Sequence, residues 1–422
     1  MSDVDRRRAE VADRWALDGG VVLVEAGSLV PVPGSDTYHP FHPHPDFAYL
    51  TEVGSPDAVL AFDAAAATWQ VFSRRLSADE LVWEPPPTAH GLSLDELDGW
   101  LAARGADRSA VRRASDPTLA AAIADVRVRK DASELDDLRR AAACSLVGFD
   151  WVYANTRPGM TERDVQIGME AGFFSAGAPR VAYDSIVASG PNGSFLHYAH
   201  GLDDVHRPAS RTIEAGDLLL IDAGALYGGY ASDVTRTMVV GAEPTDEQRF
   251  VWELVLRTQE LAIDRCRPGV EWREVHLEAA RTIGEGLVEF GLLRGRVDDL
   301  VGDGAVALFF PHGLGHLIGL TVHDVAGYPG DRERSSHPQL RYLRTDRPLE
   351  AGMITSVEPG VYFIDALLAD PVVRDRHRDD VVWERVDELR GFGGIRIEDD
   401  IHVTTGDPEV LSAAIAKPIR IG

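Results

Sequence analysis

Residues 218–237 read LLLIDAGALYGGYASDVTRT, and this segment predicts a central β-hairpin. Two apolar runs flank a Gly-Gly dipeptide at 228–229, which is typical of a two-residue hairpin turn. With the turn centred on these glycines, Asp222 lies opposite Thr235, and Asp233 follows two residues along on the same face. A turn centred one residue earlier would make the two aspartates direct partners. In either register both carboxylates lie on one face of the hairpin.

Asp222 and Asp233 are therefore candidate metal ligands. Asp222 closes an apolar run, where burying an isolated charge is costly unless a counter-ion is present. Two carboxylates that face each other repel, and a bound cation is the usual remedy. Two other interpretations remain open from this segment alone: both residues belong to turns, or one of them pairs with Arg236.

A second cluster lies in residues 309–324, which read FFPHGLGHLIGLTVHD. The glycines argue against a helix that would present His312 and His316 as a zinc pair, and they favour close approach of the backbone to a neighbour. A single histidine is more often a satisfied core residue than a ligand. Three within twelve residues, the third being His323, reverse that preference, because neutral imidazole is a common ligand for borderline metals.

Two further segments each place a glutamate in an apolar β-run. They are ITSVEPGVY, with Glu358, and GIRIEDD, with Glu398. An unpaired carboxylate would be costly at either position, although Glu398 could pair with Arg396, which shares its face of the strand. The four segments together supply four carboxylates and an imidazole, a set that suits Mn²⁺, Co²⁺, Zn²⁺ or Mg²⁺. Bridging carboxylates would hold two ions roughly 3.5–4 Å apart.

The composition limits the partners of the chain. Its 422 residues include 42 basic and 68 acidic side chains, for a formal charge of −26. So acidic a chain is a poor candidate for binding nucleic acid or an anionic membrane surface. The only cysteines, Cys144 and Cys266, form no C-x-x-C pattern, which excludes a disulfide scaffold or a thiolate zinc site. No apolar window approaches about 18 residues and no signal peptide is visible, so we expect a soluble, cytoplasmic protein.

Two domains are predicted, 1–125 and 126–422. The first has the pattern of a small α/β domain, with strands near 21–25, 58–62 and 68–72 and a helix near 93–103. Its Pro-rich stretch 38–46 is not expected to be helical. In the second domain we expect helices from a capping-box-like start at Ser133 to about 155, from a cap at Thr161 to about 176, over 245–266 and over 271–291, and strand-like structure from Phe309 onward.

The motifs DAG, SDVTR, HGLGH, VHD, VEPG and IRIED follow one another in this order along residues 126–422. In this the chain resembles the pita-bread metallopeptidases, which include methionine aminopeptidase, aminopeptidase P and prolidase. The resemblance implies an α+β fold, with a C-terminal pita-bread catalytic domain preceded by a smaller α/β domain. It also implies a site that binds two divalent ions, most readily Mn²⁺, with Co²⁺ or Zn²⁺ as alternatives.

The resemblance further implies a role for each matching residue. Asp233 and Glu398 would bridge the ions, Asp222 would bind one ion, and His316 with Glu358 the other. A water bridging the ions would attack the scissile carbonyl, and Glu358 would assist its deprotonation. The remaining matches are His197 and His323, which would contact substrate or stabilise the tetrahedral intermediate, His312, which would support the ligands and the bound substrate, and Arg396, which would orient a ligand.

Two features favour prolidase, the Xaa-Pro dipeptidase, within this family. The insertion 369–390 looks like the prolidase arrangement, and Arg344 stands where prolidases carry an arginine that clamps the carboxylate of the dipeptide. A surface arginine near Asp346 is the plainer interpretation of Arg344. The segment HPDFAYLT at 44–51 looks closer to aminopeptidase P, so an Xaa-Pro aminopeptidase acting on longer peptides is the alternative. A metal-free peptide-binding relative is disfavoured because no ligand is missing, and the family suggests a homodimer.

Overall fold

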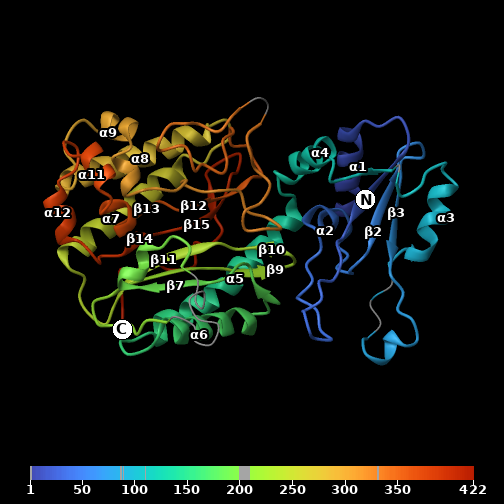
Figure 1. Cartoon of the computed structure of the whole chain (residues 1–422), viewed down its shortest axis with the longest axis horizontal. Coiled ribbons are helices and arrows are strands. Elements are labelled where there is room, and N and C mark those ends of the chain that lie inside the picture. Colours follow the sequence, from blue (N-terminus) through green and yellow to red (C-terminus); the bar gives the residue numbers. More distant parts are fainter. Residues whose placement is uncertain (1, 86–87, 89, 110, 199–209, 330–331) are drawn as a thin grey trace. The chain divides into compact units, whose positions relative to one another are not determined.

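The computed structural model describes residues 2–85, 88, 90–109, 111–198, 210–329 and 332–422. The chain divides into two compact units, Met1–Val128 and Arg129–Gly422 (Figure 1). None of the helices in these described ranges has both the length and the apolar character needed to cross a membrane.

The smaller unit is built on a five-stranded sheet with the order β4-β3-β2-β1-β5. Its strands are β1 (Val21–Glu25), β2 (Val59–Asp63), β3 (Thr68–Ser73), β4 (Leu92–Ser93) and β5 (Arg112–Arg113), and its helices are α1 (Asp3–Trp15), α2 (Pro45–Thr51), α3 (Leu97–Ala102) and α4 (Pro117–Arg127). Alternation along the strands gives the sheet two apolar faces. One face packs against Leu97 and Leu101 of α3, and on the other the ring centroids of Trp15 of α1 and Phe62 lie 5.7 Å apart.

The Pro-rich stretch 38–46 departs from its prediction at one end. Pro45 and Asp46 form the first turn of α2, because proline is tolerated at the first position of a helix. His44 caps this helix, since its Nδ1 accepts a hydrogen bond of 3.3 Å from the Asp46 amide. Two 3₁₀ turns also belong to this unit, η1 (Glu80–Val82) and η2 (Leu94–Glu96).

A four-stranded sheet of order β17-β11-β8-β7 forms the first half of the larger unit. The strands are β7 (Ile186–Ser189), β8 (Leu218–Ala223), β11 (Val234–Val240) and β17 (Arg420–Ile421), with a smaller sheet of β6 (Arg180–Val181), β9 (Ala225–Tyr227) and β10 (Tyr230–Ala231). Helices α5 (Ala132–Asn155) and α6 (Glu162–Ser175) pack on the larger sheet, and apolar side chains of both fill its core.

The hairpin predicted at residues 218–237 is confirmed. Gly228 and Gly229 both have positive φ, +58° and +91°, and Tyr227 pairs with Tyr230 across them. Of the two registers left open, the structure has the one in which Asp222 lies opposite Thr235.

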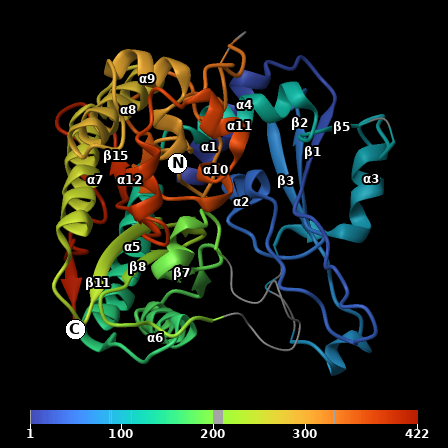
Figure 2. The same cartoon turned by 60° about the vertical axis from the view of Figure 1, so that its left-hand side comes forward.

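The second half of the larger unit adds two small sheets. They contain β12 (Ile354–Val357), β15 (Asp399–His402) and β16 (Glu409–Val410), and β13 (Gly360–Tyr362) with β14 (Gly394–Arg396). The helices are α7 (Asp246–Asp264), α8 (Trp272–Glu289), α9 (Val297–Asp303), α10 (Asp365–Leu368), α11 (Pro371–Arg376) and α12 (Trp383–Glu388), with 3₁₀ turns η3 (Gly190–Ser194) and η4 (Val306–Leu308). In both views the strands β7 and β11 lie between α6 below and α8 and α9 above (Figures 1 and 2).

The start of α5 differs from the prediction. Asp131, and not Ser133, is the capping residue, because its carboxylate accepts from the Ser133 and Glu134 amides at 3.0 Å each. Glu134 completes the capping box by accepting from the Asp131 amide at 2.9 Å. Two overlapping capping boxes were available in this stretch, and the one that ends in glutamate forms. The cap at Thr161 was predicted correctly.

Among the described residues, the strand-like structure expected from Phe309 onward begins only at Ile354, so the prediction was wrong for residues 309–329 and 332–353. In the described part of this stretch the pairing is limited to isolated bridges such as Leu317 with Thr355. Its backbone nevertheless runs beside β12, where the Ser356 amide donates to the His316 carbonyl at 2.8 Å. Gly315 permits this approach, since a Cβ there would lie 2.1 Å from the Ser356 carbonyl oxygen.

Candidate metal centre

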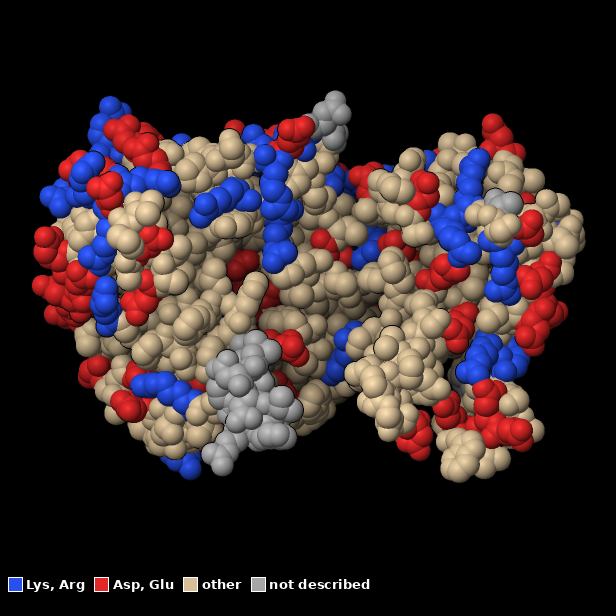
Figure 3. All heavy atoms as spheres, viewed as in Figure 1, with Lys and Arg blue, Asp and Glu red and all other residues tan. Residues whose placement is uncertain are grey.

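A pocket of about 770 Å³ opens in the larger unit. In Figure 3 acidic side chains are visible deep in a hollow of this unit, with basic side chains near its rim. All ten residues singled out from the sequence line this pocket, although they come from widely separated segments: His197, Asp222, Asp233, His312, His316, His323, Arg344, Glu358, Arg396 and Glu398.

Asp233 stands where the hairpin strand is interrupted between β10 and β11. Its amide leaves the ladder and donates to Asp400 Oδ2 at 3.0 Å. Across the hairpin, Gly224 makes room for this kink, because a Cβ there would lie only 1.8 Å from the Ser232 carbonyl oxygen. The interruption turns the Asp233 carboxylate toward the pocket floor, where the hydroxyl of Tyr183 bonds it and lies 2.7 Å from Asp222 Oδ1.

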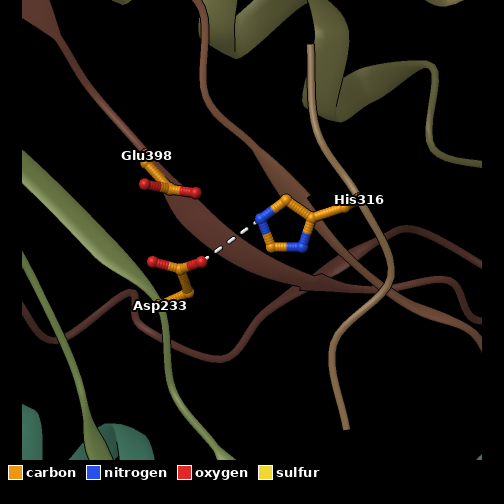
Figure 4. A group of neighbouring side chains, drawn as sticks. All are labelled: Asp233, His316 and Glu398. Atoms are coloured by element: carbon orange, nitrogen blue, oxygen red, sulfur yellow. Dashed lines mark ion pairs between the residues drawn. The ribbon is translucent and has the colours of Figure 1, made fainter. Parts of the chain in front are cut away.

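Asp233, His316 and Glu398 form the centre of the site. One potential ligand atom from each lies within 4.8 Å of the other two (Figure 4). His316 Nε2 lies 3.3 Å from Asp233 Oδ2 and 3.7 Å from Glu358 Oε1. Glu398 is fixed by the hydroxyl of Thr235, which donates to its Oε2 at 2.6 Å.

The crowding of buried carboxylates shifts their pKa values in opposite directions. Burial raises the pKa of Glu358 to about 7, and burial together with the charge of Asp233 raises that of Glu398 well above its ordinary value. Burial also raises the pKa of Asp222, against the opposing charge of Arg396. For Asp233 burial is outweighed by the hydrogen bond and charge of His316, which hold its pKa below the usual range.

Divalent cations fit this arrangement. The charged forms of several carboxylates are disfavoured by burial and by one another, and a cation among them would relieve both effects. Four carboxylates and one imidazole, without a thiolate, form a donor set suited to hard or borderline divalent ions. The residues that would hold them are Asp222, Asp233, His316, Glu358 and Glu398.

Arg396 supports one side of this ligand set. Its buried guanidinium donates to Asp222 Oδ2 at 2.5 Å, to the Thr235 hydroxyl at 3.0 Å and to the Tyr362 hydroxyl at 2.8 Å. Tyr362 in turn bonds His312 Nε2 at 2.9 Å, while His312 Nδ1 donates to the Gly313 carbonyl at 2.7 Å. Burial lowers the pKa of His312 to about 3, so this imidazole is neutral and Arg396 carries the positive charge.

Two interpretations left open from the sequence are not realised. Arg396 pairs with Asp222, whereas Glu398 is bonded by Thr235. Arg236 pairs instead with Asp399, at 2.7 Å.

His323 and Arg344 also line the pocket. The imidazole of His323 meets that of His316 edge to face, with ring centroids 4.4 Å apart. Burial and the charges of His316 and Arg344 lower the pKa of His323 to about 4. Asp324, which follows it, forms an ion pair of 2.8 Å with Lys130, and both side chains are 1% exposed.

Arg344 is exposed in the pocket and forms no ion pair or hydrogen bond with the part of the chain that the structure describes. Asp346, the partner that the plainer interpretation assigned to it, is bonded by Arg273 and lies 3.1 Å from Arg332. Arg344 therefore presents an available guanidinium to whatever the pocket binds.

Three residues at this site were not predicted from the sequence. Tyr183 lines the pocket from a segment without a recognisable motif. Tyr362 ends the quoted segment ITSVEPGVY, and its hydroxyl bonds His312 and Arg396. His276 of α8 is buried, and its Nδ1 accepts from the Leu314 amide at 3.1 Å while its Nε2 donates to the Gln339 carbonyl at 2.7 Å. His276 thus joins the loop of His316 to the segment that leads to Arg344, and only the tertiary structure reveals the link.

Comparisons with known proteins agree with this architecture. Residues 136–405 match metallopeptidase family M24, and residues 4–96 match the N-terminal domain of aminopeptidase P. The human Xaa-Pro dipeptidase is 39% identical over 291 residues, which are 69% of this chain, and the chain spans 58% of the length of that relative. A probable Xaa-Pro aminopeptidase of Emericella nidulans is 31% identical over 97% of this chain and 94% of its own.

Solved structures extend the likeness to both units. Aminopeptidase PepP of Pseudomonas aeruginosa aligns with a TM-score of 0.81 and 28% identity, covering 99% of this chain and 96% of its own. Aminopeptidase P of E. coli, solved with the inhibitor Pro-Leu, aligns with the same TM-score and coverage. The predicted α+β fold, a pita-bread catalytic domain after a smaller α/β domain, is confirmed.

Proposed function

We propose that this chain, which belongs to metallopeptidase family M24, is an Xaa-Pro dipeptidase that cleaves the bond before a C-terminal proline. Its relatives carry the names Xaa-Pro dipeptidase and Xaa-Pro aminopeptidase. The finer assignment rests on one observation. An exposed arginine without a partner in the described structure, Arg344, lines the same pocket as the metal ligands.

The proposed cofactor is a pair of divalent ions, most readily Mn²⁺, with Co²⁺ or Zn²⁺ as alternatives. Bound ions would activate water and polarise the scissile carbonyl. Among the residues of the chain, Glu358 is suited to accept a proton, because its carboxylate lines the pocket and lies 3.7 Å from His316. His323 is neutral at that pH, and we propose that it and His197 donate hydrogen bonds to the substrate.

Arg344 accounts for the preference for dipeptides. A dipeptide that ends in proline carries a carboxylate directly after the ring, whereas a longer peptide has a neutral amide there. A guanidinium binds a carboxylate through two parallel hydrogen bonds and gains little from an amide.

An Xaa-Pro aminopeptidase acting on longer peptides is the second candidate. It is favoured by the relatives and structures that match nearly the whole chain, including the smaller unit. A metal-free binding protein would need no complete ligand set, whereas all five ligands are present here. We further propose a cytoplasmic homodimer, without a nucleic acid or membrane partner.

One assay with Mn²⁺-loaded protein separates the candidates. The wild type is given Ala-Pro and Ala-Pro-Ala, and metal content is measured on the same sample. We expect the dipeptide to be preferred. Arg344→Ala should lower kcat/KM for Ala-Pro by about ten- to a hundredfold, since a charge-assisted contact contributes roughly 1.5–3 kcal/mol. Its tripeptide rate should barely change, and Arg344→Lys should restore only part of the loss.

Arg341→Ala is the matched control, because Arg341 also lines the pocket and is exposed. It should have a much smaller effect if Arg344 alone grips the carboxylate. Equal rates on both peptides in the wild type, or an equal loss on both in Arg344→Ala, would identify the aminopeptidase instead.

A further inference from the structure

Glu162, the first residue of α6, carries an unusually complete set of hydrogen bonds. The residue is fully buried, at 0% exposure. Its Oε1 accepts from the Ser189 amide at 2.7 Å, the Ser189 hydroxyl at 2.8 Å and Asn192 Nδ2 at 2.9 Å. Its Oε2 accepts from the Tyr198 hydroxyl at 3.0 Å and the Arg211 amide at 2.9 Å.

These five donors exceed what a helix end requires. An acidic residue in the first turn is stabilised by the helix dipole even when it is exposed. A buried carboxylate, in contrast, must be compensated by donors at both oxygens, and here they come from three segments. Glu162 therefore fastens the end of β7, the turn η3 and Tyr198 to one point.

Tyr198 connects this point to the pocket. It follows His197, and both line the pocket together with Leu196. Leu196 and Tyr198 pack against the buried cluster of Ile186, Ala188, Leu220 and Tyr362. The Tyr198 hydroxyl also accepts from Asn192 Nδ2 at 2.9 Å. His197, which is itself exposed, is thus held between two anchored neighbours.

We propose that Glu162 is a positioning residue that acts through Tyr198 to hold His197 toward the substrate. The proposal rests on the proposed function for the contact of His197 with substrate. The anchoring itself depends only on the contacts of Glu162. Removing the Tyr198 hydroxyl leaves the ring packing and the metal ligands in place but releases the segment that carries His197.

A double-mutant cycle tests the proposal. The variants are Tyr198→Phe, His197→Ala and their combination, each assayed on Ala-Pro with Mn²⁺. We expect His197→Ala to lower kcat/KM about ten- to a hundredfold and Tyr198→Phe about three- to tenfold, in the same kinetic parameter. The combination should be no worse than His197→Ala alone, because Tyr198 acts through His197. Effects that multiply would overturn the proposal.

Tyr153→Phe is the matched control. It also removes a tyrosine hydroxyl, which donates to the Ala416 carbonyl at 2.7 Å, and Tyr153 does not line the pocket. It should leave the kinetics unchanged. A loss equal to that of Tyr198→Phe would show a general effect of lost stability and would refute the positioning role.

Hydrogen exchange provides a readout that needs no substrate. In Tyr198→Phe and in Glu162→Gln, the amides of residues 190 and 192–198 should exchange faster than in the wild type, while Tyr153→Phe should not change them. Glu162→Gln should have the greater effect, because its amide group replaces an oxygen that accepts two of the bonds. Unchanged exchange would disprove the anchoring. If the wild type cleaves no Xaa-Pro peptide, the proposed function fails while this result still decides the role of Glu162.

Discussion

Arg396→Met is the substitution whose consequence follows most directly from the contacts at the metal centre. Methionine has a similar length and no charge, so the main loss is electrostatic. The side chain of Arg396 is 4% exposed, and it donates to Asp222, Thr235 and Tyr362. Without it, Asp222 stays buried beside Asp233 and Glu398 with no cationic side chain to compensate it.

Two magnitudes follow for Arg396→Met. Removing one partner of a buried ion pair typically costs about 3–5 kcal/mol, because the other charge remains uncompensated. We expect this loss of unfolding free energy in metal-free protein, and a smaller loss when divalent ions supply the missing positive charge. Since Arg396 also orients Asp222, metal affinity or activity should fall by about ten- to a hundredfold. The stability and metal affinity of Arg396→Lys should lie between those of the wild type and of Arg396→Met, because an ammonium retains the charge but cannot reach all three acceptors.

The assay is urea unfolding of each variant, in the presence of a chelator and again with saturating Mn²⁺, followed by a metal titration. Arg127→Met is the control, because Arg127 forms a comparable buried pair with Asp46 at 2.7 Å in the smaller unit. It should lower stability without changing metal affinity or the effect of Mn²⁺ on stability. If metal-free Arg396→Met is as stable as the wild type, the electrostatic reasoning is wrong.

Three further predictions concern single residues. Asp233→Asn should lower metal content and reduce activity by orders of magnitude while the circular dichroism stays native, and wild-type turnover in this variant would refute a dinuclear site. His323→Ala should retain its metals and lose about 10²–10³ in turnover; loss of metal instead would make His323 a ligand. His276 has a pKa of about 4 in the fold and an ordinary value of 6.5, so below pH 6.5 the unfolded state binds a proton that the folded state does not. Stability should therefore fall between pH 6.5 and 4, by about 2 kcal/mol at pH 5, and His276→Gln should flatten this slope in urea unfolding at pH 7.5 and 5.

The central hairpin was predictable because its evidence is local. Two apolar runs and a Gly-Gly turn predict the hairpin, and either of the two registers they allow brings Asp222 and Asp233 to one face. The structure has the register in which Asp222 lies opposite Thr235. Glu358 and Glu398 stood out for a related reason, since a carboxylate within an apolar run needs a partner. The residues carried over from the resemblance to the family also line the pocket.

The supporting residues could not be predicted, because their positions depend on contacts between distant segments. Tyr183 bonds two aspartates 39 and 50 residues away, and nothing around it distinguishes it from a core tyrosine. Glu162 has only the sequence signal of an acidic residue in a first helical turn, while its five donors come from later parts of the chain. At Ser133 the local signal was ambiguous, and the capping box of Asp131 formed instead.

Gly224 is required by the fold of the hairpin and not by the proposed chemistry. Its requirement is steric, since any side chain would meet the Ser232 carbonyl at 1.8 Å whether or not a cation is bound. The backbone of the hairpin itself needs neither carboxylate, and Asp222 and Asp233 serve the proposed metal site instead. In a homologue that has lost catalytic activity, Asp222 and Asp233 can be substituted, whereas position 224 should remain glycine as long as the hairpin is kept. Homologous sequences that keep this glycine but lack both aspartates would then identify proteins that retain the fold without the catalytic activity.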